Sequence, residues 1–400
     1  MLHRRASQWF DEAGDLDAAI HHAKAGGDLG RVGELVWSGI GGCIGAGRPD
    51  LLQHRLAGLS DRDIASDRWL TLSAAWLALQ IGDVDRRERW SVCAEGHAGR
   101  SWRAQLSEDP YAASYAVLLA LIGRCTVDEM QDLTTGALPG LPAESIFRSA
   151  ATFLTGICLM LKREFDGAAT VLGDAQRYAR ALDVPLIEAD AMSVLGMLTL
   201  MSGDVQAGAR LITKSAEVID EHDLDRLATA AHTLTGLALA QTLVGEPEKA
   251  TSTLQSARRL TAQLTGIAPW FAVSGRSIQA RTAALLGEGP MARQLILEAR
   301  AAMTPDLAEW LTADLLAEAA LRTATGDGVP ANVLTAAEIR VLQFLPSHLT
   351  FAQIGEHLFL SGNTVKTHAL AIYRKLGAST RHEAVTRARQ LGLVEGPVRD

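Results

Sequence analysis

A two-residue phrase, usually glycine followed by an acid, recurs at a nearly fixed spacing along the middle of the 400-residue chain. Gly203-Asp204, Gly245-Glu246 and Gly287-Glu288 are evenly spaced, and Arg163-Glu164 precedes the first of them by almost the same interval. Glycine tolerates the left-handed backbone that ends many helices, and an acid suits the start of the next helix. Five residues after each start stands a small residue that lets two helices approach closely: Ala168, Gly208, Ala250 or Ala292. The phrase therefore predicts helical hairpins that stack into a superhelix.

The composition supports an almost all-α fold. Hydrophobic residues make up 48% of the chain and charged residues 21%, which is typical of globular proteins. Alanine and leucine favour helices, and β-branched residues form no long alternating runs. No apolar run reaches the length of a membrane span, the N-terminus does not resemble a signal peptide, and four cysteines show no paired spacing. We therefore expect a cytoplasmic protein with free thiols.

The predicted hairpins resemble tetratricopeptide-type repeats with helices longer than the usual ones. We expect four regions: an irregular helical-repeat array over residues 1–135, tetratricopeptide-like repeats over 143–323, a linker over 324–332, and a separate domain over 333–396. The turn-rich segment 130–142 would separate the two arrays. A non-repetitive helical bundle is the alternative fold.

Charge is distributed unevenly along the chain. The net charge is −8, yet residues 334–394 contain seven Lys and Arg and only three Asp and Glu, a net of +4. The preceding part of the chain, 1–333, carries −11. A basic segment on an acidic body indicates two tasks, one of which is anion binding.

Helix start signals crowd the basic segment. Thr335, Thr350 and Thr380 are each followed three residues later by Glu or Gln, which is the pattern of a capping box, and Ser361 can cap a further helix. The predicted helices span 336–345, 351–358, 363–376 and 381–391. The short connection 359–362 makes the middle pair a helix-turn-helix unit, with 363–376 as the recognition helix. One small core is expected from Ile339, Leu342, Leu345, Leu349, Ile354, Leu358, Val365, Ile372, Leu376, Val385 and Leu391.

The segment 363–376 contains no acid, although a solvated surface helix normally mixes charges. Its polar residues carry hydrogen-bond donors: Thr364, Lys366, Thr367, His368, Arg374 and Lys375. With LTAAEIRVLQFL and IGEHLFLSGNTVKTHALAIYRKLGASTRHEAVTRARQLGL, the segment 334–394 resembles the LuxR-type DNA-binding domain. That resemblance implies a four-helix domain whose third helix enters the major groove.

The resemblance also implies individual contacts. Lys366 and Thr367 would face base edges, Thr364 and His368 would lie near phosphates, and Lys375 would lie near the DNA backbone. The predicted DNA-binding set is completed by Asn363 and Leu370. Two departures matter: Gly362 stands where related sequences often carry arginine, and Leu370 replaces a commonly polar residue, where it would meet a thymine methyl or reduce specificity. His348 and Phe351 also depart from the commonest turn between the first two helices.

The opening LHRRASQWFDEAGDLDAAIHHAKAGGDLGRVGELV resembles the region that follows the ATPase module in large MalT-type LuxR regulators. In those regulators the repeats bind an effector or a partner. The resemblance implies that this chain lacks the ATPase module; a longer ATPase-containing regulator whose start lies upstream is the open alternative.

Enzyme and cofactor signatures are missing from the sequence. The glycine-rich segment 42–48 lacks the Lys-Ser/Thr pair of a phosphate loop, and no CxxC, HExxH or GxSxG occurs. We expect no catalytic residue, metal site or cofactor. Trp270, Phe271, Arg276 and Trp310 would either line an effector pocket or fill the core.

Together these features predict a DNA-binding transcription regulator whose repeats sense a small-molecule or protein effector. The expected partners are double-stranded DNA, a second copy of the chain through the last helix, and RNA polymerase, with no membrane. The alternative is a protein-interaction scaffold whose DNA-binding tail is inactive or needs another subunit.

Overall fold

The computed structural model describes residues 1–123, 125–264, 268–303, 307, 338, 341, 342, 344–358 and 361–390. Within these residues the secondary structure is helical and contains no β-strand, as the composition predicted. Trp310, the predicted linker 324–332, Thr335, Ile339, Leu391 and most of the predicted helix 336–345 lie outside the described residues.

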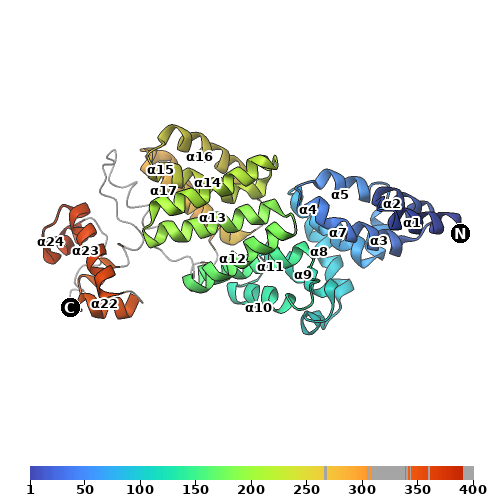
Figure 1. Cartoon of the computed structure of the whole chain (residues 1–400), viewed down its shortest axis with the longest axis horizontal. Coiled ribbons are helices and arrows are strands. Elements are labelled where there is room, and N and C mark those ends of the chain that lie inside the picture. The colour runs from blue at the N-terminus through green and yellow to red at the C-terminus, as the bar shows by residue number, and fades with distance from the viewer. Residues whose placement is uncertain are drawn as a thin grey trace.

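The helices fall into three groups along the chain (Figure 1). The first array comprises α1 (Leu2–Glu12), α2 (Leu16–Ala25), α3 (Leu29–Ser38), α4 (Ile40–Ile44), α5 (Pro49–Leu56), α6 (Asp61–Ser66), α7 (Arg68–Gln80), α8 (Val84–Ala98), the 3-10 helix η1 (Trp102–Gln105), α9 (Pro110–Ile122) and α10 (Val127–Ala137). The repeat stack comprises α11 (Ile146–Leu161), α12 (Phe165–Ala181), α13 (Pro185–Ser202), α14 (Val205–Glu221), η2 (Ala228–Ala230), α15 (Ala231–Leu243), α16 (Pro247–Thr261), α17 (Pro269–Leu285) and α18 (Gly289–Ala301). The C-terminal helices are α22 (Phe351–Leu358), α23 (Gly362–Leu376) and α24 (Arg381–Gln390).

The repeated phrase forms the turn inside each hairpin of the repeat stack. Arg163, Gly203, Gly245 and Gly287 have φ values of 65°, 103°, 85° and 81°, so all four adopt the left-handed backbone. They join α11 to α12, α13 to α14, α15 to α16 and α17 to α18, and the two helices of each pair pack against each other. The sequence prediction of stacked helical hairpins is confirmed.

The small residues of the repeat lie where the two helices of a hairpin meet. Ala168, Ala250 and Ala292 are fully buried. At Gly208 a Cβ atom would lie 2.7 Å from Leu200 Cγ and 2.8 Å from the carbonyl oxygen of Gly196 on the facing helix. Close backbone approach therefore explains the small residue at this position of the repeat.

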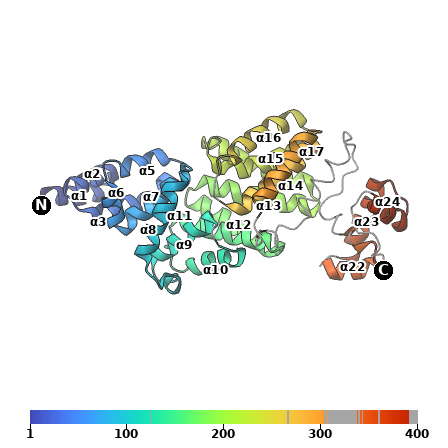
Figure 2. The ribbon, with the colours of Figure 1, turned by 180° about the vertical axis from the view of Figure 1, so that it is seen from behind.

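Successive hairpins also pack on one another, α12 on α13, α14 on α15 and α16 on α17, so the chain winds as a superhelix. Figures 1 and 2 show the first array extending from α11, with the N-terminus at the far end. Asp183 and Asp223, between consecutive hairpins, also have positive φ values, of 53° and 54°. A second left-handed turn thus separates neighbouring repeats at these two places.

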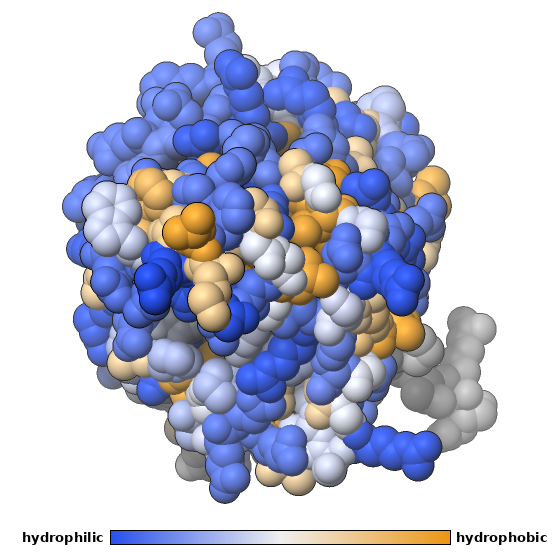
Figure 3. Space-filling view, turned by 90° about the vertical axis from the view of Figure 1, so that its right-hand side faces the viewer, coloured by the Kyte–Doolittle hydropathy of each residue, from blue (hydrophilic) through white to orange (hydrophobic). Residues whose placement is uncertain are grey.

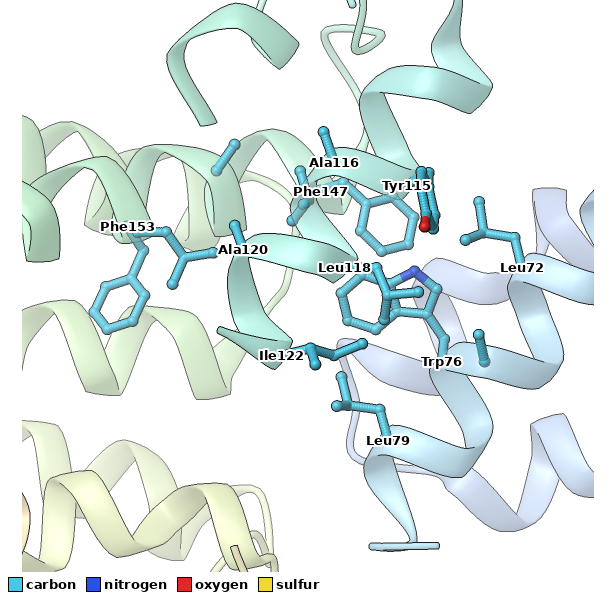
Figure 4. Packing of buried hydrophobic residues seen from close by; sticks show 14 of the residues in the cluster. Leu72, Trp76, Leu79, Tyr115, Ala116, Leu118, Ala120, Ile122, Phe147 and Phe153 are labelled. Atoms are coloured by element: carbon cyan, nitrogen blue, oxygen red, sulfur yellow. The ribbon is translucent and has the colours of Figure 1, made fainter. Parts of the chain in front are cut away.

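One hydrophobic core runs through the first array and into the repeat stack. Trp76 of α7, Leu118 of α9 and Phe147 of α11 meet in it (Figure 4). The predicted boundary between residues 135 and 143 therefore separates the irregular first array from the regular repeats, but the two share one core. Part of the turn prediction for 130–142 was wrong, because α10 continues to Ala137 and the turn occupies only 138–145. Leu133 and Met130 are buried there, and their burial outweighs the turn-forming residues around them.

Helix α13 is long and apolar enough to cross a bilayer by length and composition alone. It lies inside the repeat stack, packed against α12 and α14, and core helices of folded proteins pass the same test. The end of the molecule formed by the first helices is largely hydrophilic, with apolar patches among polar side chains (Figure 3). Met1, with Leu2 and Trp9 of α1, is among the exposed large hydrophobic residues.

Candidate nucleic-acid interface

Local capping fixes the ends of the C-terminal helices. Before α22, Thr350 Oγ1 accepts from the Gln353 N–H at 3.3 Å, and Gln353 Oε1 accepts from the Thr350 N–H at 2.9 Å. Ser361 Oγ accepts from the Thr364 N–H at 3.1 Å and so caps α23. At α24 Thr380 Oγ1 accepts from the Glu383 N–H, but the Glu383 carboxylate accepts from the Ser379 N–H, one residue earlier than expected. The start of each helix is therefore set within a few residues of sequence.

A small separate core holds these helices together. Its buried members are Val341, Leu342, Leu345, Ile354, Val365, Ala369, Ile372, Val385 and Ala388, with Leu349, Leu358 and Leu376 partly buried against them. Every predicted core residue in the described part is present in this cluster. Helices α22 and α23 pack on each other across the short connection, as a helix-turn-helix requires.

Arg381, at the first position of α24, fastens that helix to the preceding segment. Its guanidinium donates to the carbonyl oxygens of Leu345 and Leu349 at 2.8 Å, of Ser347 at 2.9 Å and of Phe344 at 3.3 Å. Sequence reasoning counted Arg381 only as a charge. The position of Arg381 in the sequence could have indicated this role. A cation at a helix N-terminus is repelled by the helix dipole, so an arginine there is expected to have another partner.

The outward surface of α23 is a narrow stripe. Val365, Ala369 and Ile372 face the core, and the residues on the opposite side are exposed: Asn363, Lys366, Thr367, Leu370 and Arg374. Their spacing of three, four, seven and eleven residues places all five along one face of the helix. Leu370 is 57% exposed, so it lies in the stripe and is not needed to complete the core. We call these five residues the α23 stripe.

The other predicted residues lie on the flank of α23. Thr364 and His368 are half-buried, and Thr364 Oγ1 lies 2.8 Å from Ser361 Oγ. Lys375 Nζ donates to Glu338 Oε2 at 2.6 Å, and the side chains are 14% and 5% exposed, respectively. This ion pair ties the end of α23 to residue 338, so Lys375 has a structural partner whatever its relation to DNA. Glu338, predicted as a capping acid, also proves to be a tertiary contact.

Gly362, at the start of α23, lies close to the backbone of Ala352 in α22. A Cβ atom at this position would lie 3.2 Å from Ala352 Cα and 3.4 Å from the Ala352 backbone nitrogen. An arginine here would therefore need a small shift of α22. The departure of Gly362 from the commoner arginine therefore has a packing explanation.

The aromatic residues that the sequence offered for an effector pocket lie mainly in the core. Trp270 and Phe271 are buried, and their rings pack against the ring of His232. Arg276 donates to the carbonyl oxygen of Ala272 at 2.8 Å and lies 3.4 Å from Glu298. In the part of the chain that the structure describes, no group of three His, Cys, Asp or Glu residues could hold a metal ion.

Comparison with known proteins identifies the C-terminal segment. Residues 332–388 match the profile of bacterial regulatory proteins of the luxR family. The chain is also similar to the HTH-type transcriptional regulator MalT of Yersinia enterocolitica serotype O:8, with 24% identity over 232 residues, 56% of this chain and 25% of the relative. The same regulator of Yersinia pestis (strain Pestoides F) is 25% identical over 233 residues, with the same shares covered. The chain thus spans about a quarter of the length of these curated relatives.

Among solved structures, the chain is similar to a Rap protein complexed with Competence and Sporulation Factor. The TM-score is 0.46 and the sequence identity is 15%, over 89% of this chain and 87% of the other.

Proposed function

Since residues 332–388 form a LuxR-family helix-turn-helix domain, we propose that this chain is a transcription regulator whose helix α23 reads the major groove of double-stranded DNA. The observation that carries the proposal is the α23 stripe, an exposed and acid-free surface on the second helix of the helix-turn-helix. The scaffold alternative does not account for a helix that excludes acids on a chain of net charge −8.

The composition of the α23 stripe suits base recognition. Lys366 can donate to guanine O6 and N7, Asn363 can pair with adenine, and Leu370 can contact a thymine methyl group. Thr367 Oγ1 donates to the carbonyl oxygen of Asn363 at 3.0 Å, which leaves its oxygen lone pairs available to a base donor. A mixed polar and apolar stripe of this kind distinguishes bases better than a wholly charged one.

The flanking residues fit the walls of the groove. Thr364 and His368, on the flank of the stripe, would contact phosphates beside the helix, and Arg374, at the far end of the stripe, would contact a further phosphate. Lys375 would lie near the backbone while bonded to Glu338, so we expect it to position α23 more than to neutralise phosphate.

The other proposed partners follow from the order of the repeats and the DNA-binding domain along the chain. Dimerisation through α24 would place two recognition helices on half-sites about one turn of DNA apart. The repeats would sense a small-molecule or protein effector, and RNA polymerase would be contacted by the DNA-bound dimer. The protein would act in the cytoplasm, with no membrane partner, no enzymatic activity and no cofactor.

The test is an in vitro selection from random duplex DNA with the full chain. The matched variants are Lys366→Ala, in the α23 stripe, and Lys214→Ala, which removes an exposed lysine from α14 in the repeat stack. We expect a two-fold symmetric motif from the parent and from Lys214→Ala, with one or two positions of that motif lost in Lys366→Ala. Absence of any enriched motif, with the protein folded, would favour the scaffold alternative.

A further inference from the structure

A cavity of about 250 Å³ lies between the first array and the repeat stack. Residues of α4, α7, α9, α11, α13 and η2 line it, together with the segments that follow α4, α7, α12, α14 and α16. Figure 4 shows part of the wall, with Trp76 and Leu79 on α7 and Phe147 and Phe153 on α11. The volume is near the lower limit for small-molecule sites. We call it the junction cavity.

One carboxyl group is set into this mainly apolar wall. The Asp190 side chain is 13% exposed, and its Oδ1 accepts from Thr233 Oγ1 at 3.0 Å. In the described part of the chain Asp190 forms no ion pair with a lysine or an arginine. His232 Nδ1 lies 3.6 Å away, but burial lowers the pKa of His232 to about 4, so the imidazole is neutral at physiological pH. Burial raises the pKa of Asp190 to about 8.

Two further lining residues carry unused hydrogen-bonding atoms. Trp76 Nε1 and Gln80 Oε1 are buried and have no hydrogen-bond partner in the described structure. Gln80 Nε2 donates to the carbonyl oxygen of Ile44 at 3.3 Å, which fixes the amide so that its oxygen is the open atom. Buried polar atoms without partners are rare in folded proteins, so both are unusual next to this wall. Gln80 Oε1 is an acceptor and Trp76 Nε1–H is a donor, and both are covered by neighbouring atoms, so Asp190 is the polar group on which the ligand class depends.

We propose that the junction cavity binds a small organic cation, an amine with an apolar body, and that Asp190, which gives up its proton when the ammonium binds beside it, is the counter-charge of that cation. The apolar walls would bury the body of the ligand, and the ammonium would lie between the Asp190 carboxyl and the aromatic rings. Trp76, Phe147 and Phe153 all line the cavity, and aromatic faces attract cations. Beside low-dielectric apolar walls, Coulomb attraction between an ammonium and a carboxylate is stronger than in bulk water.

Other ligand classes fit the cavity less well. An anion would face the Asp190 carboxyl without a buried cation to receive it. A neutral apolar molecule would leave the Asp190 carboxyl with no polar partner other than Thr233. Arg226, the other charged residue among the described lining residues, is exposed and therefore screened by solvent.

This inference rests on the proposed function in one respect only: the ligand of the junction cavity would be the effector that the proposed regulator senses. The junction cavity joins the first array to the repeat stack, so an occupant would contact both. Binding in the junction cavity can change how the first array and the repeat stack are positioned only if the ligand binds one relative position more tightly than another.

The experiment is calorimetric titration of the full chain, without DNA, with three probes of equal length: 4-phenylbutylamine, 4-phenylbutan-1-ol and 4-phenylbutanoate. We expect the amine to bind about tenfold more tightly than the alcohol, which corresponds to about 1.4 kcal/mol, and the carboxylate not to bind measurably. Asp190→Asn keeps the shape of the side chain and should remove the tenfold advantage of the amine. Asp225→Asn, an exposed neighbour outside the cavity lining, is the matched control and should change nothing.

A second variant locates the site independently of charge. Ala150 of α11 lines the cavity, and Ala150→Phe should fill it and abolish binding of both amine and alcohol. Circular dichroism of each variant shows whether it is folded. Equal affinity for amine and alcohol, an unchanged amine affinity in Asp190→Asn, or undiminished binding in folded Ala150→Phe would each overturn the proposal. Because no DNA is present, failure of the DNA selection leaves this result standing, and failure here leaves the DNA result standing.

Discussion

Lys366 shows how far the meaning of one side chain depends on its neighbours. A lone exposed lysine on a helix is usually solvated, but Lys366 lies within the α23 stripe among other donors and no acid. We expect Lys366→Ala to lose discrimination at one or two base pairs, at about 1–3 kcal/mol. A competition titration against point-substituted operators measures this. Unchanged discrimination between operators would contradict the assignment of Lys366 to a base edge.

Asp190 provides a prediction on pH and stability. Its pKa is raised to about 8 in the folded protein from an ordinary value near 3.8, so the folded state keeps a proton that the unfolded state has lost. Unfolding therefore releases a proton between those two pKa values, and the free energy of unfolding falls as pH rises through this window. His232 has a lowered pKa of about 4 and adds a slope of opposite sign only below about 6.5.

The window from pH 6.5 to 8 therefore isolates Asp190. Between these limits the parent should lose about 1–2 kcal/mol of unfolding free energy that Asp190→Asn does not lose. Urea unfolding at the two pH values measures the difference, with Asp225→Asn as the control for loss of an exposed carboxylate. Parallel pH dependence in the parent and Asp190→Asn would show that Asp190 is ionised in the folded state.

At the scale of helices, Arg381 decides how α24 is held. Its guanidinium donates to carbonyl oxygens of residues 344, 345, 347 and 349, which would otherwise need other partners. We expect Arg381→Ala to destabilise the C-terminal helices by about 2–3 kcal/mol, since charged hydrogen bonds to a partly buried group are lost. Hydrogen exchange of the full chain should show faster exchange in α22–α24 and no change in the repeat stack. His382→Ala, at the exposed neighbouring position, should leave exchange unaltered.

The repeat stack depends on close backbone approach inside its hairpins. Gly208→Ala would place a methyl group in steric conflict with the Gly196 carbonyl oxygen and with Leu200, so α13 and α14 must separate. We expect a loss of about 1–3 kcal/mol, measured by urea unfolding. Gly173→Ala in α12 is the matched control, since its Cβ would meet only Arg177 Nη1 at 3.8 Å. That control should gain about 0.5–1 kcal/mol from reduced backbone entropy. Equal effects of the two substitutions would refute the close-approach explanation.

The helices also differ in how far the sequence predicts them. Helix boundaries in the C-terminal segment followed from residues three apart, such as Thr350 with Gln353, because a cap is a local interaction. The hairpin turns followed from a repeated local need for left-handed backbone. Segment 130–142 was partly misjudged because burial of α10 against distant helices is invisible in a short window. Likewise, the Lys375–Glu338 pair and the junction cavity bring together residues that are distant in the sequence, with no periodic signal.

Across the whole molecule, the decisive property is the separation of charge. The acidic body, 1–333, carries −11, and the basic segment, 334–394, carries +4. Of these two parts only the basic segment has a net positive charge, and at ordinary ionic strength the repulsion between the acidic body and DNA acts over about 10 Å. The body should therefore weaken non-specific binding without entering the specific contacts, and affinity should depend on two DNA-binding domains acting together.

The salt dependence of DNA affinity measures how many DNA-binding domains act together. One domain with about three phosphate contacts should give a slope of log affinity against log salt of about −3, and a dimer about −5. On a symmetric site, we expect affinity to fall roughly a thousandfold between about 50 and 200 mM salt in fluorescence anisotropy. Arg374→Ala should make the slope shallower by about one per domain, whereas Lys366→Ala should lower affinity and leave the slope unchanged. A slope near −3 on the symmetric site would mean that a single domain binds. A slope altered by Lys366→Ala would show that Lys366 contacts a phosphate and not a base edge.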